Sequence, residues 1–286
     1  MKCQLDRATV YYEAKGEGRP LLCLHGWPLD HRHMVSTLEP LFRKRTGWRR
    51  LYPDLPGMGR TQGPEWLTCQ DEVLEVLVQF VDQVIPGERF CVAGLSYGGL
   101  LAQGLVHRLG ERLDGVLFVV PSMGPKEARR LAPWRLIHEE PLDTTGVSPE
   151  DLAGFREMAV AQTQRLLDAW KNTILPPQEL ADDPFLERLR KHYGFSFDHR
   201  ALPRAFEKPT LFLVGRQDNV CGYVDAWDVI ESYPRATFAV LDRAGHCLDM
   251  EQPELTKALI NEWLDRVEEA AEALPYPPIG GGVNRT

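Results

Sequence analysis

The sequence lacks any long hydrophobic segment. No stretch approaches the roughly 20 consecutive apolar residues that a helix needs to cross a bilayer. The beginning of the chain, MKCQLDRATVYYEAKGEG, also has no apolar run of the length found in signal peptides. These absences predict a soluble, cytoplasmic protein with no membrane partner.

An excess of positive charge is also missing. The 286 residues include 33 Lys and Arg against 41 Asp and Glu, which gives a net charge of -8. A chain of this sign repels a phosphate backbone, so we expect no nucleic acid partner. The sequence leaves the oligomeric state open between a monomer and a homodimer.

Paired cysteines and clustered metal ligands are absent as well. The six cysteines show no C-x-x-C spacing, and Cys23 and Cys91 lie within apolar runs typical of buried strands. We therefore expect free thiols. His31 and His33 lie close together in the sequence, but no further ligands cluster near them, so we expect no metal site.

Short apolar runs alternate with longer amphipathic stretches along most of the chain. This alternation is typical of the α/β class, in which a mostly parallel sheet carries helices on both faces. Several runs are apolar throughout, as central parallel strands are. The expected strands are 9–14, 20–24, 48–52, 90–94, 115–120, 210–214 and 237–241, and the expected helices are 31–42, 69–84, 97–109, 223–233 and 253–270.

The interval 121–206 interrupts this alternation because it has helical signals but no run typical of a buried strand. We interpret it as a helical cap, or lid, inserted into a core formed by residues 1–120 and 207–270. Residues 271–286 are rich in Pro and Gly without periodicity, which predicts a flexible tail.

Two helix starts stand out within the predicted cap. Ser148 precedes Pro149 and Asp183 precedes Pro184, and both pairs are typical of the first turn of a helix. Side chains then recur at helical spacing after the first start: Leu152, Phe155, Ala159, Gln162, Leu166 and Trp170.

The segment Gly94-Leu95-Ser96-Tyr97-Gly98 matches the pattern G-x-S-x-G between an expected strand and an expected helix. This context predicts a nucleophile elbow, in which small glycines let the backbone reverse and the serine hydroxyl is exposed. Free N–H groups at the start of the helix favour the negative charge that develops during acyl transfer. Ser96 is therefore the candidate nucleophile; the alternative is that it only caps the helix.

A serine becomes a good nucleophile when a histidine takes its proton and a carboxylate orients that histidine. His246 follows the last expected strand and Asp218 follows the strand before it, so both lie at strand ends, where α/β sheets gather catalytic groups. We expect His246 to be the general base and Asp218 the orienting acid. Asp249, close to His246 in the sequence, is the second candidate for the acid.

Two backbone N–H groups must hold the negative oxygen of a tetrahedral intermediate. We expect Tyr97, directly after the nucleophile, to supply one, and Trp27, in the loop after an early strand, to supply the other. In that loop Gly26 permits a sharp turn and Pro28 restrains it, which allows a cis Trp27–Pro28 bond. We expect His25 to form structural hydrogen bonds.

In these motifs the chain resembles the α/β-hydrolase superfamily from about residue 2 to residue 267. The segments HGWP, DLPGMGRT, GLSYGG, GRQD and AGH occur in the family's order. The resemblance implies an eight-stranded, mostly parallel sheet flanked by helices, with a helical cap inserted after the sixth strand, 113–120. It also implies that residues 54–60 form a structural turn beside the site.

The HGWP segment is similar to that of the epoxide hydrolase and dehalogenase branches, which use aspartate where this chain has Ser96. This departure argues against both activities. The resemblance implies a cofactor-free serine hydrolase, most similar to carboxylesterases (EC 3.1.1), that cleaves a carboxylester, thioester or lactone bond of a small organic substrate through an acyl-enzyme. Two alternatives stay open: a carbon–carbon bond hydrolase of a diketone-type substrate, and a non-catalytic ligand-binding protein on the same fold.

Aromatic and cationic side chains of the predicted cap are candidates for the pocket wall: Trp134, Phe155, Leu166, Trp170, Arg129, Arg130 and Arg135. The arginines would meet an acidic substrate. Aromatic residues at helical spacing are also typical of a packed core, and an arginine run is also typical of a solvated face.

Overall fold

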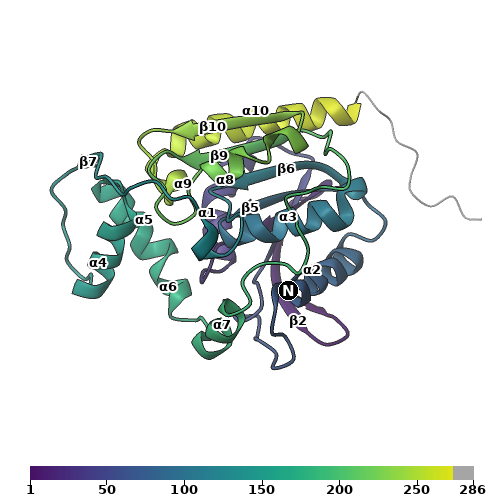
Figure 1. Ribbon diagram of the computed structural model, residues 1–286, viewed down its shortest axis with the longest axis horizontal. Coiled ribbons are helices and arrows are strands. Elements are labelled where there is room, and N and C mark those ends of the chain that lie inside the picture. The colour runs from purple at the N-terminus through teal and green to yellow at the C-terminus, as the bar shows by residue number, and fades with distance from the viewer. Residues whose placement is uncertain (273–286) are drawn as a thin grey trace, which may run out of the picture.

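A central sheet of eight strands organises the computed structural model, which describes residues 1–272 (Figure 1). The strands, in spatial order, are β1 (Lys2–Gln4), β2 (Thr9–Lys15), β4 (Trp48–Pro53), β3 (Arg19–Leu24), β5 (Phe90–Leu95), β6 (Leu113–Val119), β9 (Thr210–Gly215) and β10 (Ala236–Leu241). β2 pairs antiparallel with both β1 and β4, and the other neighbouring pairs are parallel. The α/β class and the eight-stranded, mostly parallel sheet are confirmed.

Helices cover both faces of this sheet. The helices of the core are α1 (His31–Phe42), α2 (Gln70–Val84), α3 (Tyr97–Leu109), α8 (Val224–Trp227), α9 (Leu248–Glu251) and α10 (Pro253–Glu272). Successive strand residues point to opposite sides, so Leu22 and Leu24 pack with α2 and α3, whereas Leu21 and Cys23 pack with α1 and α10. The central strands are apolar throughout because both of their faces are buried.

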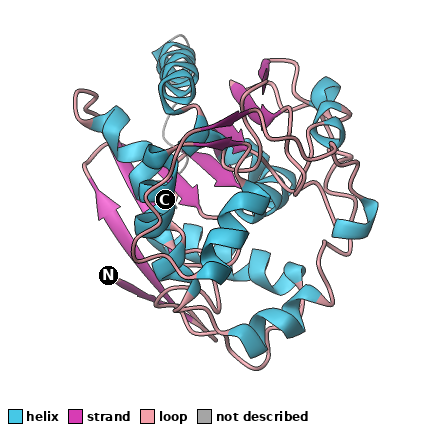
Figure 2. Cartoon of the chain, turned by 90° about the vertical axis from the view of Figure 1, so that its left-hand side faces the viewer, coloured by secondary structure: helices cyan, strands magenta, loops and turns pink. Residues whose placement is uncertain are grey.

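The chain between β6 and β9 forms short helices and two short strands beside the sheet (Figures 1 and 2). These elements are β7 (His138–Glu139), α4 (Pro149–Met158), β8 (Ala161–Gln162), α5 (Gln164–Thr173), α6 (Leu175–Gln178) and α7 (Asp183–Arg190). Phe155 and Trp170 of this insertion pack with Leu29, Cys247 and Met250, which belong to loops and helix α9 of the core. This apolar cluster joins the insertion to the core.

The helical spacing within the insertion is divided between two helices. Ser148 is the N-cap of α4, as expected, and its side chain accepts a hydrogen bond from the backbone N–H of Asp151. The chain then leaves the helix, and Thr163 caps a new one by accepting a hydrogen bond from the N–H of Leu166. Trp170 therefore belongs to α5 and not to the helix that begins after Ser148.

The structure corrects one further local prediction, confirms another and adds one strand. The expected helix 223–233 consists only of α8 and a 3-10 turn, Ile230–Ser232, in a stretch whose β-branched residues lower helix propensity. Helix α7 begins at Asp183 as predicted, and Asp182 is its N-cap, whose side chain accepts a hydrogen bond from Phe185 N. The short edge strand β1 was not expected at all.

Most of the predicted flexible tail, residues 273–286, lies outside the described residues, and residues 271 and 272 form the end of α10. Within residues 1–272, no helix is long and apolar enough to cross a bilayer. All six cysteines are free thiols, as expected.

Candidate active site

Ser96 occupies the turn between β5 and α3 with a positive φ of 53°. A residue with a side chain pays about 1–3 kcal/mol of strain for such a backbone conformation. The two motif glycines make the turn sterically feasible. A Cβ on Gly94 would lie 2.3 Å from the carbonyl oxygen of Gly98, and a Cβ on Gly98 would lie 2.2 Å from that of Leu24. The motif thus folds into the predicted elbow.

His246 and Asp218 extend a chain of hydrogen bonds that begins at Ser96. The Ser96 hydroxyl lies 2.9 Å from Nε2 of His246, and Nδ1 of His246 lies 3.0 Å from Oδ2 of Asp218. When Nδ1–H donates to the carboxylate, Nε2 is free to accept the serine proton. The three residues follow β5, β10 and β9, so the carboxyl ends of three strands bring them together.

The loop after β9 holds Asp218 in place. Oδ1 of this fully buried carboxylate accepts hydrogen bonds from Val220 N at 2.8 Å and from Cys221 N at 2.9 Å. Burial acts to raise the pKa of Asp218, but the charge of His246 and the hydrogen bonds together hold it below its ordinary value. Asp218 therefore stays ionised and keeps His246 oriented.

Asp249, the second candidate for the acid, is paired with a different histidine. Its Oδ2 lies 3.0 Å from Nε2 of His33 and accepts a hydrogen bond from the Thr37 hydroxyl at 2.6 Å. Nδ1 of His33 and Oδ1 of Asp249 are buried without a hydrogen-bond partner among the described residues. No sequence motif signals this second pair, which forms because α1 and α9 meet beside the site.

The backbone N–H groups of Trp27 and Tyr97 lie near the serine. Tyr97 is the first residue of α3, and the Trp27 loop approaches so closely that a Cβ on Gly26 would lie 3.4 Å from Cβ of Ser96. Neither N–H group donates a hydrogen bond to another described residue. The Trp27–Pro28 bond is cis, as the sequence allowed. The expectation that these two N–H groups hold the oxygen of an intermediate stays a prediction.

Structural hydrogen bonds fix the surrounding loops. His25 accepts the N–H of Leu55 through Nε2 at 2.9 Å and donates through Nδ1 to the next carbonyl, which is the role expected of it. Asp54 accepts hydrogen bonds from His31 and from the N–H of Arg60, so the turn 54–60 is tied together beside the site.

Two acids lie beside His31, contrary to the expectation that no further ligands cluster near it, and this group is close enough to suggest a metal centre. Ligand-type atoms of Asp30, His31 and Asp54 lie within 4.8 Å of one another. The Asp30 carboxylate, however, accepts hydrogen bonds from the backbone and guanidinium of Arg32, and Asp54 binds His31 directly. These acids serve protein hydrogen bonds, so the cluster is explained as part of the loop structure.

A cavity of about 280 Å³ is lined by Ser96 and His246. Core residues such as Leu29 and insertion residues such as Met158 and Trp170 form its apolar wall. Its volume is just below the range of about 300–1,000 Å³ that is typical of small-molecule sites. The cavity thus combines a reactive hydroxyl with room for a small apolar group.

Only part of the expected wall faces this cavity. Trp170 and Arg129 line it, whereas Phe155 and Leu166 are buried in the apolar cluster of the insertion. Trp134, Arg130 and Arg135 are absent from the wall. Helical spacing could identify residues that become buried, but it could not identify those that face the site.

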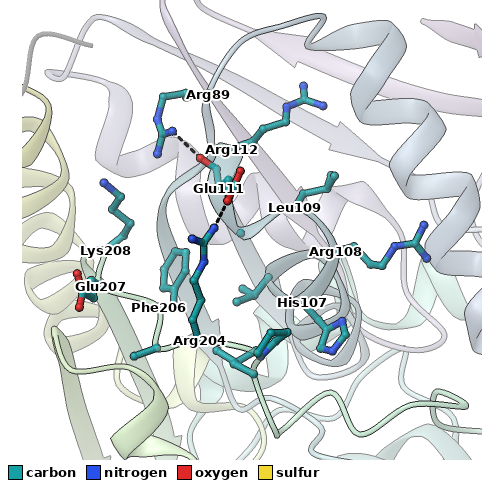
Figure 3. Close-up of a pocket in the computed structure, with 15 residues that line it drawn as sticks. Arg89, His107, Arg108, Leu109, Glu111, Arg112, Arg204, Phe206, Glu207 and Lys208 are labelled. Carbon is teal, nitrogen blue, oxygen red and sulfur yellow. Dashed lines mark hydrogen bonds and ion pairs between the residues drawn. The ribbon is translucent and has the colours of Figure 1, made fainter. Parts of the chain in front are cut away.

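A larger hollow of about 960 Å³ lies near the amino ends of β6 and β9, away from Ser96 (Figure 3). The end of α3 and the chain before β9 form its wall. Its cations are bound within the protein: Arg204 pairs with Glu111, and Arg112 pairs with Asp82. The smaller cavity, which holds the reactive residues, is therefore the candidate active site.

Glu251 connects the insertion to the loop of His246. Its Oε2 accepts a hydrogen bond from Gly245 N at 2.6 Å, and its Oε1 accepts from Val160 N at 2.7 Å and Ala161 N at 3.2 Å. Burial raises the pKa of Glu251 to about 7, although the three N–H groups act in the opposite direction. Sequence reasoning missed this residue because Val160 lies 91 positions away and no motif joins them.

Comparison with known families agrees with this geometry. Residues 21–259 match the model described as the alpha/beta hydrolase family. The chain belongs to the alpha/beta hydrolase family. The family that the motifs indicated is thereby confirmed.

Relatives of this alpha/beta hydrolase span nearly its whole length. It is 25% identical over 274 residues to the AB hydrolase superfamily protein YisY of Bacillus subtilis, which covers 90% of this chain and 96% of that protein. It is 22% identical over 264 residues to a pimeloyl-(acyl-carrier protein) methyl ester esterase of Legionella pneumophila, and this match covers 90% of this chain and 99% of that protein. The crystal structure of an alpha/beta superfamily hydrolase from Oenococcus oeni is similar with a TM-score of 0.87 at 28% identity, over 94% of this chain and 99% of that one.

Proposed function

We propose that this hydrolase cleaves an ester-like bond, a carboxylester, thioester or lactone, of a small organic substrate, as carboxylesterases (EC 3.1.1) do. One observation carries the proposal: the Ser96 hydroxyl lies 2.9 Å from His246, whose other nitrogen lies 3.0 Å from Asp218. The likeness to a methyl ester esterase supports ester chemistry.

The first step forms an acyl-enzyme. Ser96 Oγ attacks the carbonyl carbon while Nε2 of His246 takes the hydroxyl proton, and Asp218 stabilises the imidazolium that results. The carbonyl oxygen becomes negative and accepts hydrogen bonds from the N–H groups of Trp27 and Tyr97. The bond to the leaving group then breaks, and His246 returns the proton to that group.

Water completes the reaction. His246 accepts a proton from a water molecule, whose oxygen attacks the acyl carbon and forms a second tetrahedral intermediate. The bond to Ser96 breaks, the serine regains its proton from His246, and the acid is released. In this proposal residues 121–206 act as the cap of a core formed by 1–120 and 207–270, since insertion residues such as Met158 and Trp170 line the cavity.

A fluorophosphonate probe and 4-nitrophenyl esters of short acids test this proposal. The wild-type protein should be labelled and should hydrolyse an ester. Ser96→Ala should lose both properties, with a fall in kcat on the order of a millionfold. Ser232→Ala, which changes a serine remote from the cavity, is the matched control and should behave as the wild type.

The other outcomes identify the rival functions. A protein that is labelled at Ser96 and hydrolyses no ester, but cleaves a diketone-type ring-cleavage product, would be a carbon–carbon bond hydrolase. A folded wild type that takes no label would indicate a ligand-binding protein, and the proposed reaction would be abandoned.

A further inference from the structure

Arg129, a cation on the cavity wall beside Lys126, forms no ion pair with an acid among the described residues. The Arg129 guanidinium donates through Nε to the carbonyl of Gly124, through Nη1 to the carbonyl of Val220, and through Nη2 to the hydroxyl of Ser122, each at 3.0 Å. All three acceptors are neutral, and within residues 1–272 no carboxylate forms an ion pair with Arg129. The half-buried side chain also lies over the ring of Tyr193, 5.3 Å from its centroid, so it is held in one position without a carboxylate counter-charge.

Short chains of hydrogen bonds connect this cation to the catalytic residues. Ser122, which accepts a hydrogen bond from Arg129, donates its backbone N–H to the carbonyl of Ser96 at 2.9 Å. Val220, which also accepts from Arg129, donates its N–H to Asp218. Arg129 and Ser96 line the same cavity. A group bound at Arg129 would therefore lie in the same cavity as the carbonyl that reacts with Ser96.

Neighbouring arginines differ from Arg129. Arg130 forms an ion pair with Asp225, and Arg190, which also lines the cavity, pairs with Glu187. Glu127 also lines the cavity, but no carboxylate in the described part of the chain, 1–272, forms an ion pair with Arg129. A partly desolvated cation without a counter-charge is costly, and a bound anion would offset that cost.

The chemistry of the guanidinium indicates which anion. Its planar fork carries five N–H groups, of which three are engaged, so two are left for a ligand. Such a fork suits the two oxygens of a carboxylate. We propose that Arg129 binds a carboxylate of the substrate, so that the preferred substrates are esters with a carboxylate near the reacting carbonyl, such as monoesters of short dicarboxylic acids. This inference rests on the proposed ester hydrolysis at Ser96.

Two esters of equal chain length test the inference. Mono-4-nitrophenyl glutarate carries a terminal carboxylate, 4-nitrophenyl pentanoate lacks it, and kcat/KM is measured for both. We expect the wild type to prefer the glutarate ester. Arg129→Gln should lower the ratio of the two kcat/KM values by about 10- to 100-fold, the range of a charge-assisted hydrogen bond. Arg130→Gln, whose ion pair lies outside the cavity, should keep the wild-type ratio.

Fluorophosphonate labelling of Ser96 counts the folded active sites of each variant. An unchanged ratio in labelled Arg129→Gln would overturn the inference. If that variant does not fold, inhibition of the wild type decides: glutarate should inhibit hydrolysis of the pentanoate ester competitively and more strongly than pentanamide, and equal inhibition would overturn the inference.

The wild type also separates this inference from the proposed function. Hydrolysis of the pentanoate ester without preference for the glutarate ester would refute carboxylate binding and leave ester hydrolysis standing. A wild type that is neither labelled nor active on either ester would refute both.

Discussion

Two buried histidine–aspartate pairs lie beside the cavity, and they differ in what each histidine faces. His246 with Asp218 and His33 with Asp249 each join a ring nitrogen to a carboxylate oxygen at 3.0 Å. The second nitrogen of His246 lies 2.9 Å from the Ser96 hydroxyl, whereas that of His33 has no hydrogen-bond partner among the described residues. The first pair can therefore exchange a proton with a serine, and the second has no such group to activate.

Electrostatics does not separate the two pairs. Burial acts to raise the pKa of Asp218 and of Asp249, and in both cases the neighbouring histidine and further hydrogen bonds hold it below its ordinary value. The pairs differ in support: backbone N–H groups at the end of β9 fix Asp218, whereas the Thr37 side chain binds Asp249. Position at a strand end beside the elbow, and not the perturbed pKa, distinguishes the pair that we propose to be catalytic.

The largest expected difference between the pairs is in turnover. Asp218→Asn should lower kcat on the order of 10⁴-fold, because the amide no longer holds His246 in the tautomer that accepts the serine proton. Asp249→Asn should lower kcat about tenfold or less, since this residue touches neither Ser96 nor His246. Ester hydrolysis measures both. Equal losses in the two variants would show that the second pair takes part in the reaction.

The second pair should instead matter for stability. Asp249→Ala should lower the free energy of unfolding by about 4 kcal/mol, because it leaves His33 buried without its partner. Replacement of both residues by leucine should recover much of this loss, since apolar side chains of similar volume carry no such penalty. Urea denaturation measures each variant. If the double leucine variant were as unstable as Asp249→Ala, the loss of stability would not come from leaving His33 without its partner.

Glu251, two residues after Asp249, extends the comparison to pH. Its pKa is about 7 in the folded protein, above the ordinary value of 4.5, so the protonated form contributes stability that is lost as pH rises through 7. Glu251→Gln removes this titration. The free energy of unfolding of the wild type, minus that of Glu251→Gln, should therefore decrease by about 2–3 kcal/mol as pH rises from 4 to 8. A difference that stays constant over this range would contradict the prediction.

Local sequence was sufficient for the sheet and for the elbow. Strands buried on both faces are marked by continuous apolar runs, so β3, β5, β6 and β9 were predicted within a few residues. The edge strand β1 has three residues, of which only Cys3 is buried, and such a segment carries no periodic signal. The motif around Ser96 dictates its own turn because its glycines are needed for close backbone contacts.

Long-range contacts explain what the sequence analysis missed. The insertion leaves its helical path between α4 and α5, where Val160 and Ala161 donate to Glu251 of α9. The preference of Asp249 for His33 depends in the same way on the packing of α1 against α9. Neither contact produces a pattern among neighbouring residues of the sequence. Asp218 could therefore be preferred to Asp249 only because it follows a predicted strand.

The smallest predicted effect isolates one side chain that supports the second pair. Thr37 has a single hydroxyl proton, and its distance of 2.6 Å from Asp249, against 3.1 Å from the carbonyl of His33, assigns that proton to the carboxylate. Thr37→Val keeps the shape and removes this bond, so it should lower the free energy of unfolding by about 1 kcal/mol in urea denaturation. No equivalent substitution exists at Asp218, because its donors are backbone N–H groups at the end of β9. The kcat of Thr37→Val should stay at the wild-type value. A fall in kcat as large as that of Asp218→Asn would mean that the two pairs are coupled through the cavity wall.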